Sequence, residues 1–349
     1  MKTSFISTAA VSQAMRYSML RTQGDLINAQ KEVATGKLAD TGLALGARTA
    51  QAVNFARDLE RLNGIVDSNS LVSSRLSSTQ LALGKLSGVA QNLLATLTAS
   101  ASGDAATPVM EASAKAALDE LTAILNSSLN GEHLFAGVNT DVKPIDSFSD
   151  PGSTSKAAFD AAFLGHFGFA QSAPAAANIT AAQMDTFITN VVEPQFLGAG
   201  WQANWSNATD QKIVSRIALN ETTETSVNAN SDGMRKLAMA AATISDLFSS
   251  NLSTAGKEQL VTRAIAYVGE AIGNLASLQS QTGIVEKRVK DASERIEMQA
   301  TLFEKHILDM EGVDPYEAST RVADLLSHIE TSYALTARIQ QLSLLRFLS

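Results

Sequence analysis

The sequence lacks cysteine altogether, and it holds only 6 prolines and 5% aromatic residues in 349 positions. Without thiols the chain can form neither disulfides nor Cys-ligated zinc sites. Hydrophobic residues still make up 45% of the chain, so the core must consist mainly of Ala, Leu, Val and Ile. Such a core suits thin layers of helices better than a thick globular interior.

Clusters of positive charge and long apolar runs are also missing. The net charge is −8 and the chain has no Lys/Arg cluster, which argues against a nucleic-acid partner. No run of about eighteen apolar residues occurs, so we expect no membrane span. Residues 1–20 contain Ser, Thr, Gln and Arg16, which interrupt the continuous apolar stretch that a Sec signal peptide needs.

Recognisable catalytic and metal-binding patterns are absent from the sequence as well. It contains no P-loop, no Gly-x-Gly-x-x-Gly, no His-Glu-x-x-His and no Gly-x-Ser-x-Gly. None of the 4 histidines has a glutamate three positions before it, as helical di-iron sites require. We therefore expect a protein that is not an enzyme and that holds no metal and no cofactor.

A long heptad pattern runs from Val261 to Met310. Positions that alternate three and four residues apart are apolar, except for Thr282, Gln299 and His306. A seam of this kind stays on one side of an under-wound helix and must be buried against other helices. The pattern predicts one helix of roughly 75 Å, at about 1.5 Å per residue, and hence a rod-forming protein.

The N-terminal part of the chain repeats this spacing. It predicts an amphipathic helix at residues 12–33, which Gly36 ends, followed by a linker at 37–46. A second helix of about fifty residues begins near residue 47 and runs to about residue 97.

Shorter helices are expected further along the chain. Apolar spacing predicts them at 108–129 and 234–248. Asp314, Pro315 and Glu317 together resemble a capping box, which would begin a last helix.

The middle of the chain, residues 139–232, has a different character. It holds four of the six prolines and both tryptophans, and the heptad pattern disappears. Short helices are predicted at 156–163 and 181–192, and residues 212–228 alternate like a strand. These features indicate a small α+β domain. Its tryptophans are expected in its core, with a sugar- or partner-binding surface as the alternative.

The predicted fold is therefore mainly α, with long antiparallel helical bundle or coiled-coil arms built from both termini and a small inserted α+β domain. We expect a terminal helical pair from residues 1–45 and 311–349. A long-helix bundle domain follows from residues 46–138 and 233–310. Residues 139–232 form the inserted domain.

The two outer helices have apolar stripes but no evident partner in the rest of the chain. Two helices that pair only with each other leave much of this apolar surface exposed to water, so helices of this length would be only marginally stable. We therefore expect burial between subunits by polymerisation, with a simple dimeric coiled coil as the alternative. The predicted assembly residues are Met15, Met19, Leu26, Val33, Val322, Leu325, Ile329, Tyr333, Ile339, Leu342 and Leu345.

Three segments carry a resemblance to a known family. Residues 26–37 read Leu-Ile-Asn-Ala-Gln-Lys-Glu-Val-Ala-Thr-Gly-Lys, residues 131–137 end in the turn Phe135-Ala136-Gly137, and residues 332–345 end in Ser-Leu-Leu. In this order, and at these distances from the termini, the segments resemble the flagellin superfamily. Within it they are most similar to the hook-filament junction proteins, the L-type hook-associated group. The likeness covers both arms and not the middle.

The resemblance implies a structural component of the bacterial flagellum that joins the hook-associated ring to the flagellin filament by intersubunit helix packing. The implied partners are further copies of the chain in a ring or helical assembly, the other hook-filament junction protein, flagellin, and an export chaperone on the C-terminal helix. It also implies type III export without a Sec signal peptide and an extracellular location at the hook-filament junction.

Two other functions fit parts of the sequence. A divergent flagellin of the filament proper would share the same termini, although the Phe-Ala-Gly turn favours the junction protein. A signalling coiled-coil protein of the chemoreceptor type would explain the long helices. It would, however, need a membrane span or kinase site and a constrained hairpin tip, where this chain has an irregular domain.

Overall fold

The computed structural model describes residues 8–101, 107–248 and 251–348, and within these ranges it describes side chains from residue 10 to residue 338. The chain is mainly α-helical, with long helices packed against each other and small antiparallel sheets, so the predicted fold class is confirmed. The elements in chain order are α1 (Thr8–Thr35), α2 (Thr41–Leu45), η1 (Gly46–Arg48), α3 (Thr49–Ala101), α4 (Thr107–Leu125), β1 (Ser128–Leu129), β2 (Glu132–His133), α5 (Thr154–Phe167), η2 (Pro174–Asn178), α6 (Ala181–Phe187), the π-helical η3 (Ile188–Val192), α7 (Glu193–Leu197), α8 (Gly200–Asn204), β3 (Val214–Ala218), β4 (Glu221–Glu224), α9 (Asp232–Leu247), α10 (Thr254–Glu311) and α11 (Pro315–Leu348).

Contacts divide the chain into two compact units. The terminal unit comprises residues 1–64 and 296–349, and the central unit comprises residues 65–295. Both boundaries fall inside long helices, α3 and α10. The three-part division expected from the sequence stays a prediction.

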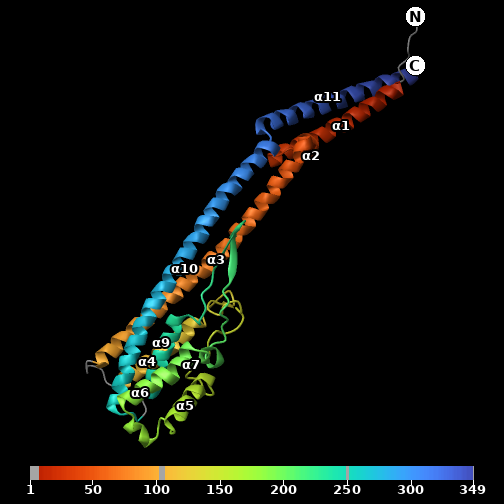
Figure 1. Ribbon diagram of the computed structural model, residues 1–349. Helices are drawn as coiled ribbons and strands as arrows, with labels where there is room; N and C mark the ends of the chain where they lie inside the picture. Colours follow the sequence, from red (N-terminus) through yellow and green to blue (C-terminus); the bar gives the residue numbers. More distant parts are fainter. Residues whose placement is uncertain (1–7, 102–106, 249–250, 349) are drawn as a thin grey trace. The chain divides into compact units, whose positions relative to one another are not determined.

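In the terminal unit, α1 and α11 lie side by side (Figure 1). The side chain of Gln23 contacts Tyr333 and that of Glu32 contacts Arg321, so the two helices are antiparallel. The parts of α3 and α10 that belong to this unit also pack together, with the Phe55 and Phe303 ring centroids 5.4 Å apart.

The apolar seam of α10 follows the predicted positions up to Ile296 and again at Phe303 and Met310, which are half-buried. Gln299 and His306, which the strict alternation placed in the seam, are exposed, and Ala300 and Ile307 are buried instead. The reason is an additional four-residue step between Ile296 and Ala300, which changes the phase of the seam. His306 stacks on the ring of Phe55 at a centroid distance of 5.5 Å.

The central unit has one large hydrophobic core and a smaller separate cluster of Leu76, Ile217, Val289 and Ala292. The large core contains residues of α3, α4, α9 and α10 together with side chains of the inserted segment. Trp201 is 0% exposed and Trp205 is 2% exposed, and their rings stack with an interplanar angle of 8°. The two tryptophans are therefore core residues, as the sequence indicated, and no sugar-binding surface is built from them.

The helix predicted at residues 108–129 ends earlier, at Leu125. Leu129 instead pairs with Glu132 in the antiparallel β1–β2 hairpin. Its turn residues Asn130 and Gly131 both have positive φ, 54° and 87°. An Asn-Gly pair with this geometry favours a tight hairpin, and this local signal outweighs the helical spacing.

The ends of the terminal helices also differ in detail from the prediction. Asp40 caps the short helix α2 inside the predicted linker, because its carboxylate accepts a hydrogen bond from the Leu43 N–H at 2.9 Å. At the start of α11, the Asp314 carboxylate accepts from the Tyr316 N–H at 2.8 Å. Glu317, expected to complete a capping box, accepts a hydrogen bond from Arg321.

Candidate assembly interface

Six of the residues predicted for assembly are half-buried on the paired helices α1 and α11. We call the half-buried ones the terminal seam, and its members are Met15, Met19, Leu26, Val322, Leu325 and Ile329. Among the other predicted residues, Val33 is 41% exposed and Tyr333 is 53% exposed. Ile339, Leu342 and Leu345 lie within α11, but their side chains are outside the described residues. Pairing of the two helices thus leaves the seam only partly buried.

A second apolar surface on α1 was not predicted. Tyr17, Leu20 and Ile27 are 67%, 64% and 64% exposed, and we call them the outer stripe. Because successive residues of an α-helix are about 100° apart, the outer stripe lies roughly 100–180° around α1 from its terminal-seam residues, on a different side of the helix. The steps of three and seven residues were visible in the sequence. They were missed because the first stripe already explained the helix as amphipathic.

The turn after α1 and the turn before α11 are joined by backbone hydrogen bonds. Gly36 ends α1 with a φ of +67°, as predicted. The Leu38 N–H donates to the Glu311 carbonyl at 2.8 Å, and the Val313 N–H donates to the Gly36 carbonyl at 3.0 Å. We call residues 36–39 and 311–313, which form this short antiparallel bridge, the joint.

The Phe135-Ala136-Gly137 turn lies in the central unit, where the inserted segment leaves the helices and returns to them. Phe135 is fully buried, and its carbonyl accepts the Ala229 N–H at 2.8 Å. Ala136 forms a β-bridge with Asn228. Gly137 has a φ of +72°, and a Cβ atom there would lie 2.3 Å from the Thr209 hydroxyl. The motif therefore fixes the point at which the beginning and the end of the inserted segment meet.

Two polar side chains that the sequence did not single out hold this region in place. Arg75 of α3 donates to the Glu132 carboxylate at 2.8 Å and to the His133 carbonyl at 2.7 Å, which fastens the hairpin to the helix. The Asn126 amide both donates to the Ile145 carbonyl and accepts from the Ile145 N–H. Neither role could be read from spacing, because each depends on chain segments that meet only in the fold.

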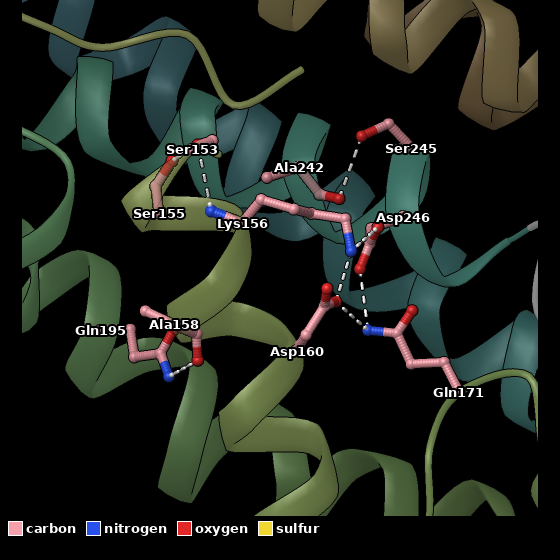
Figure 2. A network of polar contacts seen from close by, with 10 residues as sticks. All are labelled: Ser153, Ser155, Lys156, Ala158, Asp160, Gln171, Gln195, Ala242, Ser245 and Asp246. Atoms are coloured by element: carbon pink, nitrogen blue, oxygen red, sulfur yellow. Dashed lines mark hydrogen bonds and ion pairs between the residues drawn. The ribbon is translucent and has the colours of Figure 1, made fainter. Parts of the chain in front are cut away.

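A polar network joins α5 to α9 beside a pocket of about 530 Å³ (Figure 2). Lys156 contacts Asp160 on its own helix and Asp246 of α9, the latter at 3.0 Å. Gln171 donates to both carboxylates, at 3.0 and 2.8 Å. Burial alone would lower the pKa of Lys156, but hydrogen bonds and charge attraction from the two aspartates outweigh it and raise that pKa above its ordinary value. Burial raises the pKa of Asp246.

A second network ties the segment around the π-helix to α10. Arg263 donates to the Asp185 carboxylate at 2.6 Å, and Tyr267 donates to Glu193. The Arg263 hydrogen bond lowers the pKa of Asp185, while burial, reinforced by the Glu193 hydrogen bond, raises the pKa of Tyr267. In both networks polar side chains pair with each other between different helices. Networks that stabilise the fold also shift pKa values, so these shifts do not by themselves indicate a functional site.

Within the described ranges, no group of His, Asp and Glu side chains has the arrangement needed to hold a metal ion. The described helices likewise include none that is both long and apolar enough to cross a membrane.

The terminal helices define the class of protein. They pair with each other, yet the terminal seam is only half-buried and the outer stripe is exposed to solvent. This is expected for a helical subunit that assembles through its terminal helices.

Comparisons with known proteins agree with this class. Residues 6–140 match the bacterial flagellin N-terminal helical region, and residues 265–348 match the bacterial flagellin C-terminal helical region. These regions together cover more than half of the chain, and the chain belongs to the flagellin family. The predicted superfamily is thereby confirmed, and termini of this type imply self-assembly into a flagellar structure.

A solved structure has the same fold. It is that of a Vibrio parahaemolyticus protein described as flagellar hook-associated, with a TM-score of 0.52 and 10% sequence identity. The similarity covers 76% of this chain and 97% of the other. No significant match was found among curated protein sequences.

Proposed function

We propose that this chain is a structural subunit of the flagellar hook-filament junction, where it joins the hook-associated ring to the flagellin filament. The observation that carries the proposal is the incomplete burial of α1 and α11. The terminal seam is half-buried and the outer stripe is about two-thirds exposed. Helices with two such surfaces become stable when neighbouring subunits cover them.

The outer stripe supplies a useful driving force for this assembly. Complete burial of one large apolar side chain contributes about 1.5–3 kcal/mol. With about two-thirds of each stripe residue still to be covered, Tyr17, Leu20 and Ile27 would together contribute roughly 3–6 kcal/mol per subunit. Because association itself costs free energy, the outer stripe would act together with the other contacts between subunits.

The junction role, in preference to the filament itself, rests on the Phe135-Ala136-Gly137 turn and its resemblance to junction proteins. The proposed partners are other copies of the chain, the second hook-filament junction protein and flagellin. No catalytic activity is proposed. The chain would leave the cell through the flagellar export channel and be located at the extracellular junction.

A flagellar export chaperone on α11 is a further proposed partner. An amphipathic helix with uncovered apolar residues is suited to bind in a groove of another protein. Leu326 and Leu335 of α11 are 42% and 48% exposed. A chaperone bound there would shield these residues before export, and it would have to leave before assembly.

Deletion of the gene tests the junction role most directly. We expect electron microscopy to show bare hooks, while flagellin accumulates in the medium because it is made and exported but not retained. Normal filaments on the deleted cells would exclude a junction protein and would favour a minor flagellin.

Removal of residues 322–349 tests whether assembly depends on α11. We expect the central unit to stay folded, because its core lies within residues 65–295, while assembly and motility are lost. A truncated chain that still supports motility would contradict the proposal. The milder variant L325S/I329S, which changes the terminal seam and keeps the helix length, serves as the matched comparison.

A further inference from the structure

A buried carboxylate lies beside the joint of the terminal unit. Glu32 of α1 is only 9% exposed. Its Oε1 atom accepts the Ala39 N–H at 3.2 Å, and its Oε2 atom accepts a hydrogen bond from Arg321 of α11 at 3.0 Å. Because an unpaired charge is costly to bury, Glu32 requires both partners.

The same contacts hold the backbone of the joint. Lys31 donates to the Ala39 carbonyl at 2.9 Å, so both backbone groups of Ala39 are bound by neighbouring residues of α1. Leu38 and Val313 complete the bridge between the two turns. At Gly312 a Cβ atom would lie 2.4 Å from the Leu308 carbonyl, so the second turn leaves no room for a side chain. Glu32 thus lies where the turn after α1 and the start of α11 are fixed together.

The sequence of α11 makes the Glu32–Arg321 pair selective for one register. A shift of α11 by one helical turn would bring either Glu317 or Asp324 to the position that Arg321 occupies. Either shift would place a second carboxylate beside the buried Glu32, and two like charges at close distance repel each other. The terminal seam selects less strongly, because a shift of one turn brings another apolar residue of α11 to the same face, for example Leu325 to the place of Val322.

We propose that Glu32 and Arg321 form a register lock, which fixes α11 against α1 in the single subunit and so positions the terminal helices for assembly. The proposal rests on the proposed function, because the lock has a purpose only if these helices are covered by other subunits. Glu32 and Arg321 are positioning residues, and they need not contact a neighbouring subunit.

The absence of cysteine allows the register to be measured by cross-linking in the full-length chain. Gln23 donates to the Tyr333 hydroxyl at 3.1 Å, so the pair Q23C/Y333C reports the native register with a short bis-maleimide. The pairs Q23C/E330C and Q23C/A337C report shifts of about one turn in either direction. Each pair is placed in the unchanged background and in the E32Q, R321Q and D25N backgrounds. D25N is the matched control because Asp25 is an exposed acidic residue of α1.

In the unchanged and D25N backgrounds, we expect the native pair to cross-link at least about tenfold faster than the shifted pairs, the size of effect expected for a charged hydrogen bond. In E32Q and R321Q, the rates of the shifted pairs should rise to within about threefold of the native pair. The double variant E32Q/R321Q should behave like either single variant, because both remove the same interaction. Unchanged tenfold selectivity in E32Q and R321Q would overturn the lock.

Assembly is measured separately with cysteine-free E32Q and R321Q proteins, by their ability to restore filaments to cells lacking the gene. Loss of filaments together with loss of register supports the positioning role. Filaments at the normal level despite lost register overturn it. If deletion of the gene itself leaves filaments unchanged, the junction role fails and with it the positioning role, whereas the cross-linking rates still decide whether the register lock exists.

Discussion

The substitution Gly137→Ala tests whether the Phe135-Ala136-Gly137 turn requires glycine because Thr209 lies so close to it. Gly137 has a φ of +72°, and an added Cβ atom would lie 2.3 Å from the Thr209 hydroxyl and 2.4 Å from the Thr209 carbonyl. The distances are too short for any non-bonded contact, so Thr209 must move. Thr209 donates its N–H to the Ala136 carbonyl and accepts the Val138 N–H, each at 3.0 Å, and movement breaks both bonds.

The cost has two parts. A non-glycine residue in the left-handed region costs about 1–2 kcal/mol. Two lost hydrogen bonds cost about 1 kcal/mol each, which brings the expected loss in the free energy of unfolding to about 3–4 kcal/mol. Gly131 is the matched control, since its φ is +87° and an added Cβ would meet nothing within 4 Å. G131A should therefore cost only about 1–2 kcal/mol.

The assay is urea unfolding of both variants followed by far-ultraviolet circular dichroism. The G137A midpoint should be clearly lower than that of G131A, with similar slopes, because both variants expose the same surface on unfolding. Equal stability of the two variants would refute the close approach of Thr209 as the reason for glycine in the motif.

Further predictions concern the terminal helices and the polar network. L20S/I27S should leave the helix content of the subunit unchanged but strongly reduce assembly measured by sedimentation. The control L164S, which changes another exposed leucine, should not reduce assembly. Equal loss of assembly in both variants would contradict the role of the outer stripe. Limited proteolysis of dilute subunits should remove segments of α1 and α11 before the central unit is cut, and protection of both ends would mean that they are already buried. Because the pKa of Lys156 is raised above its ordinary 10.5, its stabilising contribution is complete below that pH and disappears as the pH rises through the higher value. Alkaline titration should therefore weaken the packing of α5 against α9, and K156M should lack this step.

The helical part of the fold was predictable because it depends on local spacing. The seam of α10 from Val261 to Ile296 could be read residue by residue, since each apolar position is fixed by the helical period. Beyond Ile296 the prediction holds for Phe303 and Met310 but is wrong at Gln299 and His306, because a strict alternation cannot show where a four-residue step intervenes. The β1–β2 hairpin was missed although Asn130-Gly131 is a strong turn signal, because the apolar spacing of α4 continues through Leu129.

The candidate site was predictable only in part. The terminal-seam residues follow from periodicity and are half-buried on the α1–α11 pair, whereas their role in assembly stays a prediction. Glu32 could not be recognised, because a glutamate at the end of an amphipathic helix is usually a solvated residue. Its partner Arg321 is 289 positions away, and only the fold brings the two together.

The burial of both tryptophans has a practical consequence for measurements on this chain. Trp201 and Trp205 belong to the central unit, and their rings stack with an interplanar angle of 8°. Their fluorescence therefore reports on the core of that unit alone. Tyr17 and Tyr333 belong to the terminal unit and are 67% and 53% exposed. Tryptophan emission will therefore follow melting of the central unit and be insensitive to association of the ends. Tyrosine emission, excited in a variant with both indoles replaced by phenylalanine, will follow association.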